Sequence, residues 1–243
     1  MKPADLLFTQ GFGTRRECAA LVASGGLDVE GAGVIDDFER ELDVAGELWF
    51  RVCGGPRWPY RPRALVVMNK PAGYECSQKP RHHPSVYSLL PAPLRGRGVQ
   101  AIGRLDEDTT GVLLFTDDGT LVHRLTSPKH HVAKVYEVRC RHPVDPGQVE
   151  RLCSGVLLHD ENETVRAAAC EPTGERALRL TLTEGKYHQV KRMVAAAGNR
   201  VEALERSAFG RHRLDGLAPG AWRWLSDEEA TAVTQKRTAA SPA

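Results

Sequence analysis

The sequence predicts an α+β protein in which a mostly antiparallel, mixed sheet forms the larger of two domains. Short β-like runs alternate with stretches of helical periodicity along the second part of the chain. No glycine-rich phosphate loop joins a strand to a helix, which disfavours a doubly wound nucleotide-binding fold. Residues 53–63 combine glycine, proline and arginine as a linker does, so a small α/β domain is expected before the sheet.

The small domain should contain two helices and a hairpin. Helical patterns at 4–12 and 14–25 precede alternating residues around glycines at 27–37. Thr14 is the expected N-cap of the second helix, with Glu17 at the capping-box position. We therefore predict a first domain at 1–52, a linker at 53–63, a second domain at 64–232 and a flexible tail at 233–243.

The second domain should alternate strands with helices. The runs that predict strands are 64–71, 111–116, 134–140 and 177–185, and those that predict helices are 119–127, 146–155 and 187–198. In the last of these helices, Val190, Met193, Val194 and Ala197 recur at helical spacing. They are expected to form its buried stripe, which leaves Lys191 and Arg192 on a wetter side.

The composition is that of an ordinary globular protein, with 41% hydrophobic and 26% charged residues among 243. No stretch approaches the roughly 20 apolar residues of a membrane span, and the start of the chain lacks a signal-peptide pattern. A cytoplasmic protein with no membrane partner is therefore expected. The six cysteines form no CxxC pair and the paired histidines lack a third ligand, so no metal is expected.

The net charge of +2 conceals an asymmetry between the two domains. Residues 1–52 hold five Lys/Arg against ten Asp/Glu, a net charge of −5, so the rest of the chain carries +7. A basic body of this kind suits a polyanion such as a nucleic acid. A solvated basic face is the alternative interpretation of the composition.

Asp106 stands out among the acidic residues because a tight loop presents it just before an apolar run. It follows Gly103 and precedes Thr109, Thr110 and Gly111 in the segment GRLDEDTTG. Such a loop can hold a functional carboxylate at the edge of a sheet. An aspartate that only caps its own turn is the alternative for this residue taken alone.

Four segments together resemble one known family. They are NKPAGYECSQKPRHHPSVYSLLP at 69–91, GRLDEDTTG at 103–111, TSPKHHVAKVYEV at 126–138 and EGKYHQVKRMVAAAGNRV at 184–201. In this order they are similar to the pseudouridine synthases that modify bacterial ribosomal RNA, and most to the members that act on 16S rRNA. The resemblance implies an enzyme that detaches uracil from its ribose, turns it and rejoins it through C5, with no cofactor or metal.

The catalytic positions of that family fall on three residues of this sequence: Asp106, Tyr136 and Lys186. Asp106 would act either as nucleophile at the sugar or as the base that starts a glycal route, and both remain open. Lys186 would be the cation paired with this carboxylate, where other members carry arginine. Tyr136 would stack on the target base, with a core tyrosine as its alternative.

The RNA surface implied by the resemblance is basic. Arg104 would hold a phosphate or help to evict the uridine from its stack. The other residues expected to contact RNA are Lys70, His130, His131, Lys191 and Arg192 around the pocket, and Arg15 and Arg16 in the first domain. Residues 1–52 resemble the S4 RNA-binding domain, although most of their charge is acidic.

The expected partner is 16S rRNA in a partly assembled small ribosomal subunit, bound by a monomeric enzyme. Two alternatives are a 23S rRNA enzyme of the same family and a non-catalytic RNA-binding factor of ribosome assembly. A glycosidase with Asp106 and Asp108 as its paired carboxylates is disfavoured, because both lie on one short loop instead of flanking a sugar.

Overall fold

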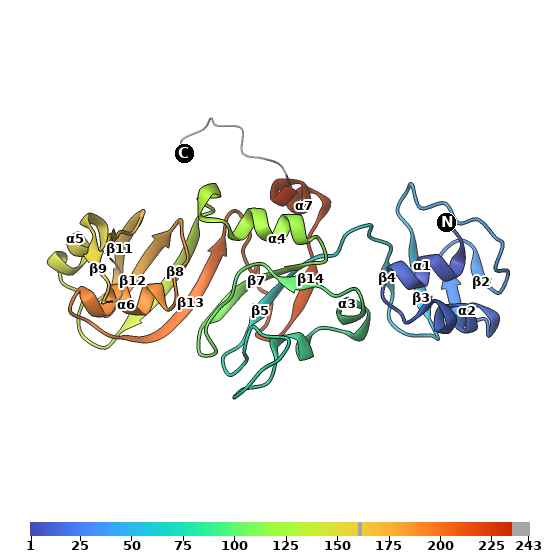
Figure 1. Cartoon of the computed structure of the whole chain (residues 1–243), viewed down its shortest axis with the longest axis horizontal. Helices are drawn as coiled ribbons and strands as arrows, with labels where there is room; N and C mark the ends of the chain where they lie inside the picture. Colours follow the sequence, from blue (N-terminus) through green and yellow to red (C-terminus); the bar gives the residue numbers. More distant parts are fainter. Residues whose placement is uncertain (160–161, 235–243) are drawn as a thin grey trace. The chain divides into compact units, whose positions relative to one another are not determined.

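The computed structural model describes residues 1–159 and 162–234, which form two compact units (Figure 1). Unit 1 comprises Met1–Ala64 together with Leu90–Val99, and unit 2 comprises the rest of the described chain. The predicted start of the flexible tail at residue 233 is too early, because residues 233 and 234 still belong to the last helix, Asp227–Thr234. Val233 is buried there, with 4% of its surface exposed. Residues 235–243 of that tail lie outside the described residues.

Unit 1 begins with two short helices, α1 (Pro3–Thr9) and α2 (Arg15–Ala23). Thr14 accepts a hydrogen bond from the Glu17 backbone while the Glu17 carboxylate accepts from Thr14, which confirms the predicted capping box. A four-stranded sheet follows in the order β2-β1-β3-β4. Its strands are β1 (Leu27–Val29), β2 (Gly33–Ile35), β3 (Trp49–Val52) and β4 (Trp58–Pro59).

The boundary between the units differs from the sequence prediction in two places. The predicted linker contains β4, which pairs with β3, and Trp58 of β4 lies 5.6 Å from the Phe12 ring. The second place is α3 (Ala92–Gly96), which belongs to unit 1 although it follows the first strand of unit 2. A Cβ on Gly96 would lie 2.4 Å from the Gly11 carbonyl oxygen, so only glycine permits this approach of two distant segments.

Unit 2 is built on a mostly antiparallel sheet in the order β11-β12-β8-β13-β7-β5-β14, with β6 paired to β7, which confirms the predicted fold class. The parallel pair, β13 with β7, joins its two halves through only two residue pairs. The strands are β5 (Leu65–Lys70), β6 (Gln100–Ala101), β7 (Thr110–Thr116), β8 (Lys134–Cys140), β11 (Ala169–Gly174), β12 (Ala177–Leu182), β13 (Val201–Phe209) and β14 (Trp222–Trp224). A separate pair consists of β9 (Val156–Leu157) and β10 (Thr164–Val165).

Helices cover both halves of this sheet (Figure 1). They are η1 (Val86–Leu89), α4 (Gly119–Thr126), η2 (Pro128–His130), α5 (Pro146–Ser154), α6 (Gln189–Ala196) and α7 (Asp227–Thr234). Leu121 of α4 packs with Val67, Val112 and Leu114 of the central strands in one buried cluster. In α6, the stripe from Val190 to Ala197 is buried at every predicted position, which confirms the helical phase.

Candidate active site

The loop that carries Asp106 is held from beneath by a buried lysine. Lys70, at the end of β5, has no exposed surface, and its ammonium donates to the carbonyl oxygens of Pro71, Glu107 and Thr109 at 2.9–3.0 Å. Burial lowers the pKa of this lysine. Its position contradicts the expected RNA contact of Lys70, because all three of its ammonium protons can be used by the loop backbone.

The register of the central strands brings the expected catalytic groups together. On β13, Arg206 lies opposite Tyr136 of β8 on one side and Gly111 of β7 on the other. A Cβ at position 111 would lie 2.3 Å from the Arg206 carbonyl oxygen, and the φ of Gly111 is +104°, so only glycine fits at this second position of β7. The Asp106 loop therefore enters the sheet directly beside the row that contains Tyr136.

Two basic groups from the start of α6 contact the Asp106 carboxylate. Lys191 Nζ lies 3.2 Å from Oδ2, and His188 Nε2 lies 3.3 Å from Oδ1. Lys191 also bonds Asp108 Oδ1 at 2.6 Å, so one ammonium joins two carboxylates of the same loop. Burial alone would lower the pKa of Lys191, but its bonds with Asp108 and Asp106 outweigh this and raise it.

Asp106 opens into a cleft of about 290 Å³ within unit 2. Four predicted residues line it together, namely Arg104, Asp106, Tyr136 and Lys186. The Asp106 side chain is 26% exposed, whereas Tyr136 is 8% exposed and forms part of the wall. The cleft thus combines a carboxylate, a phenol and several cations within a space that a single nucleotide base can enter.

The sequence analysis missed two cations in the same cleft. Lys134 donates to the Val132 carbonyl at 3.0 Å, and burial together with the charge of Arg206 lowers its pKa to about 8. Arg206 is 2% exposed and donates from Nε to the Val112 carbonyl at 2.8 Å. The sequence did contain a signal for Arg206: it stands at every-second-residue spacing with Leu204 and Ala208 along β13, which predicts that all three side chains share the buried face of the strand.

The remaining predicted residues lie outside this cleft. His130 is on η2 and His131 follows it, both exposed, and Arg192 on α6 donates to the Tyr187 carbonyl at 3.3 Å. Arg15 and Arg16 are exposed on α2 of unit 1. Arg15 is already paired with Asp5 at 2.7 Å.

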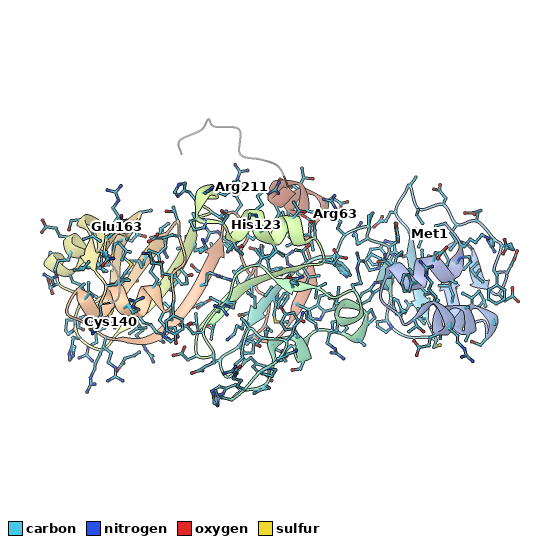
Figure 2. The ribbon with its side chains drawn as sticks, viewed as in Figure 1. Met1, Arg63, His123, Cys140, Glu163 and Arg211 are labelled. Carbon is cyan, nitrogen blue, oxygen red and sulfur yellow. The ribbon has the colours of Figure 1, made fainter. Side chains whose placement is uncertain are left out.

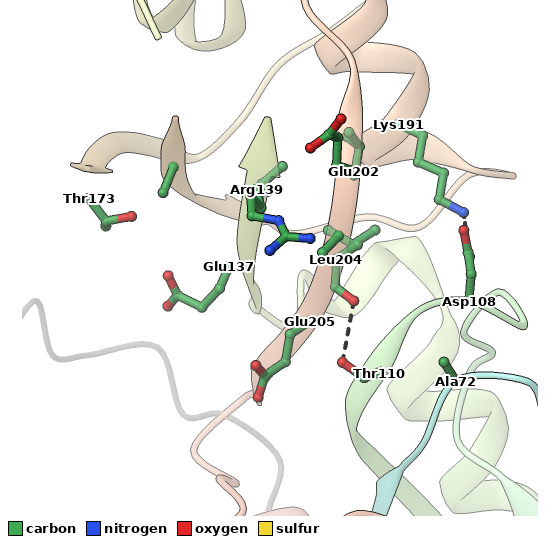
Figure 3. Close-up of a pocket in the computed structure, with 14 residues that line it drawn as sticks. Ala72, Asp108, Thr110, Glu137, Arg139, Thr173, Lys191, Glu202, Leu204 and Glu205 are labelled. Atoms are coloured by element: carbon green, nitrogen blue, oxygen red, sulfur yellow. Dashed lines mark hydrogen bonds and ion pairs between the residues drawn. The ribbon is translucent and has the colours of Figure 1, made fainter. Parts of the chain in front are cut away.

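A second cleft of about 500 Å³ lies in the same unit, and Figure 3 shows the Lys191–Asp108 pair at its edge. Its wall includes the carboxylates Glu137, Glu202 and Glu205 beside Arg139. Lys191 therefore stands between the two clefts, since it also contacts Asp106. This mostly acidic lining favours the first cleft as the place where an anionic substrate reacts.

Two kinds of feature were searched for in the part of the chain that the structure describes: clusters of metal-binding side chains and helices that could cross a membrane. Over residues 1–159 and 162–234, no cluster of three or more His, Cys, Asp or Glu side chains could hold a metal ion. No helix in those ranges has the length and apolar character needed to cross a bilayer.

Comparison with known proteins identifies the class that this fold and cleft define. The family model described as RNA pseudouridylate synthase matches residues 64–196. The chain belongs to this family and is an RNA pseudouridine synthase, an isomerase acting on uridine in RNA. A solved structure described as a pseudouridylate synthase matches with a TM-score of 0.68 and 30% identity, covering 96% of this chain and 100% of that one.

Three relatives carry the name ribosomal small subunit pseudouridine synthase A. The protein of Escherichia coli K12 is 44% identical over 180 residues, which cover 74% of each chain. That of Pasteurella multocida is 44% identical over 212 residues, 87% of each chain. That of Vibrio parahaemolyticus is 38% identical over 229 residues, covering 90% of this chain and 94% of its own.

Proposed function

We propose that this enzyme converts one specific uridine of 16S rRNA to pseudouridine in a partly assembled small ribosomal subunit. The observation that carries the choice of target is its similarity to three proteins named for the small subunit, over as much as 90% of the chain. The enzyme acts as a monomer in the cytoplasm. As the resemblance to the family implies, the proposal includes no metal or cofactor.

In this proposal Asp106 is the catalytic carboxylate. It acts on the ribose, either as nucleophile or as the base that starts a glycal route. Both roles use the carboxylate oxygens of Asp106, which Lys191 and His188 contact at 3.2 and 3.3 Å and so hold in place. Lys186, in the wall of the same cleft, supplies a further positive charge.

Tyr136 and Arg104 handle the base in the proposed mechanism. The Tyr136 ring forms a wall against which the extruded uracil stacks while it turns. Arg104 stands two residues before Asp106 in the same wall and holds the flanking phosphate or fills the space that the uridine leaves. Extrusion costs about a few kcal/mol, less at an unpaired uridine, and the basic lining offsets part of it.

The choice of target is tested by mapping pseudouridine after incubation with purified enzyme. The substrates are partly assembled small-subunit particles, mature small subunits, naked 16S rRNA and naked 23S rRNA, and carbodiimide treatment with primer extension locates the product. We expect one position in 16S rRNA, formed fastest in partly assembled particles. Modification of 23S rRNA alone would overturn the target, and equal rates on naked 16S rRNA would overturn the preferred assembly state.

Unit 1 is proposed to choose the site instead of supplying general affinity for RNA. Its first 52 residues carry a net charge of −5, so counterion release cannot be its main contribution. Deleting residues 1–52 should therefore spoil site choice more than it weakens non-specific RNA binding. That deletion also removes Gln10, whose side chain binds Arg97 in the α3 segment at 2.8 Å.

A point variant avoids this side effect of the deletion. Arg16→Glu reverses an exposed charge on α2, and Arg40→Glu makes the same change at another exposed position of unit 1. We expect only Arg16→Glu to reduce modification of the target relative to other uridines. Equal site choice by Arg16→Glu and wild type would contradict the proposed contact of α2.

A further inference from the structure

The catalytic cleft contains a buried arginine whose charge has no partner among the described residues. Arg206 is 2% exposed and lines the cleft from β13, which runs between β8 and β7 in Figure 1. Figure 2 draws the side chains along the same ribbon. Over residues 1–159 and 162–234, its side chain makes one hydrogen bond, from Nε to the Val112 carbonyl, and its buried Nη2 has no partner. A guanidinium carries five N–H donors, so most of them are left for a ligand.

A second cation close to Arg206 makes the lack of a counter-ion more costly. Lys134 lines the same cleft, where burial and then the charge of Arg206 lower its pKa to about 8. Neither of these side chains forms an ion pair with a carboxylate in the part of the chain that the structure describes. Two cations held together in a buried space indicate a site that is completed when a substrate brings negative charge.

The reaction creates negative charge beside Tyr136. When the C1′–N1 bond breaks, its electron pair leaves with uracil and spreads over N1, O2 and O4 of the ring, in both routes open to Asp106. Tyr136 lies opposite Arg206 in the register of β8 and β13. Residues paired in this way have side chains on the same face of the sheet, about 5 Å apart at Cβ. A base stacked on Tyr136 therefore has the Arg206 guanidinium at its edge.

We propose that Arg206 donates to a carbonyl oxygen of the target uracil and stabilises the anion that forms when the glycosidic bond breaks. The Val112 carbonyl and the Phe209 ring, 5.2 Å from the guanidinium carbon, hold the cation before the substrate enters. A fixed charge in a water-poor wall stabilises the developing anion more than the neutral base. The charge disappears when C5 of uracil bonds to C1′ and then loses its proton.

A phosphate of the RNA is the other anion that this cation could bind. The depth of Arg206 favours the base, because an arginine that is 2% exposed is reached only by a group that enters the cleft. The two ligands also predict different kinetics. Loss of a phosphate contact would weaken RNA binding and leave the rate of the bound complex unchanged, whereas loss of contact with the anion would lower that rate.

The first test measures how strongly the reaction depends on the leaving group. Fluorine at C5 withdraws electrons and stabilises the uracil anion, so an enzyme without the cation should gain more from it than wild type. The substrates are partly assembled small-subunit particles whose 16S rRNA carries uridine or 5-fluorouridine at the mapped target position. Fluorinated C5 has no proton to lose, so the readout is loss of the intact N-glycoside in single turnover, followed by nuclease digestion and chromatography of the target fragment.

Arg206→Met should slow the reaction of uridine by about 100-fold or more, the usual effect of removing a donor to a developing anion. Its loss on 5-fluorouridine should be at least about tenfold smaller, while RNA affinity stays within about threefold of wild type. The ratio of the two rates is taken within one preparation, so any misfolded fraction cancels. Equal losses on both substrates would overturn the proposal and give Arg206 a purely structural role. Weaker RNA binding with a normal single-turnover rate would overturn it in favour of a phosphate contact.

Two further variants separate the charge of Arg206 from its structural bond. Arg124→Met removes a half-buried arginine of α4 that donates to the Val233 carbonyl at 2.7 Å, outside the cleft, and both rates should stay within about twofold of wild type. Arg206→Lys keeps the charge, so its ratio of rates should lie closer to wild type than that of Arg206→Met. Equal ratios in Arg206→Lys and Arg206→Met would refute the role of the charge. The proposal rests on the isomerase activity of the family, so if 23S rRNA proves to be the target, the same comparison is made at that position.

Discussion

Replacing Lys134 by methionine should change how the stability of unit 2 depends on pH. The folded pKa of this lysine is about 8 against an ordinary value of 10.5, because burial and the nearby Arg206 disfavour the charged amine. Between these two values the unfolded chain binds a proton that the folded chain does not. Raising the pH through this window therefore stabilises the wild type, and the variant lacks this gain.

The expected size follows from the shift in pKa. A difference of about 2.5 units at ~1.36 kcal/mol per unit gives an upper limit of ~3.4 kcal/mol. Solvent screening at this half-buried position reduces the expected gain to ~1–2 kcal/mol between pH 7 and pH 10. Loss of the Lys134 bond to the Val132 carbonyl shifts the variant by about 1 kcal/mol at every pH, so it does not affect the pH trend.

The assay is urea unfolding followed by tryptophan fluorescence at several pH values. Trp49 and Trp58 are replaced by phenylalanine in all proteins, so the signal comes from Trp222 and Trp224 in unit 2. The difference in unfolding free energy between wild type and Lys134→Met is then plotted against pH. The same substitution at exposed Lys129 provides a baseline for the removal of a lysine. A difference that stays constant from pH 7 to pH 10 would refute the buried, weakly protonated amine.

Three further substitutions test the cleft itself. Asp106→Asn should lower turnover below about one hundredth of wild type while RNA affinity stays within about threefold, measured by single-turnover product mapping and filter binding; higher turnover would assign the chemistry to another residue. Lys191→Met should lower the single-turnover rate by about 10–100-fold, because Asp106 and Asp108 lose a shared cation. Lys186→Met should also lower this rate. A normal rate in either variant would remove that lysine from the mechanism. Lys70→Met should lower the free energy of unfolding by about 3 kcal/mol or more, since three carbonyl oxygens lose their donor. The melting temperature should fall by about 6–12 °C. An unchanged melting temperature would show that the loop does not depend on this lysine.

The sequence predicted the parts of the fold that depend on local patterns. The capping box at Thr14 and the buried stripe of α6 follow from neighbours within one or two turns of a helix, and both are present. The α3 segment was assigned to the wrong side of the boundary because its place depends on the contact between Gly11 and Gly96, which lie far apart in the chain. No periodicity within either segment reports such a contact.

The candidate site shows the same limit at the level of single lysines. Sequence resemblance placed Asp106, Tyr136 and Lys186 in one site, and the structure brings all three to one cleft. It could not assign the state of each lysine, because that depends on which charged or polar groups the fold brings close. Lys70 donates to backbone carbonyls and so braces the loop, and burial lowers its pKa despite the nearby carboxylates of Glu107, Asp108 and Asp106.

Lys134 and Lys191 complete the contrast, since the fold places them in opposite electrostatic surroundings. Lys134 has the Arg206 guanidinium as a neighbour, and this repulsion adds to burial and lowers its pKa to about 8. Lys191 meets the carboxylates of Asp106 and Asp108, and their attraction outweighs burial and raises its pKa. Above pH 8 the cleft therefore loses one positive charge from its wall and keeps the one that pairs with Asp106. If activity falls above pH 8 in the wild type but not in Lys134→Met, the charge of the wall lysine contributes to catalysis. If the two profiles are parallel, the charge of Lys134 does not contribute.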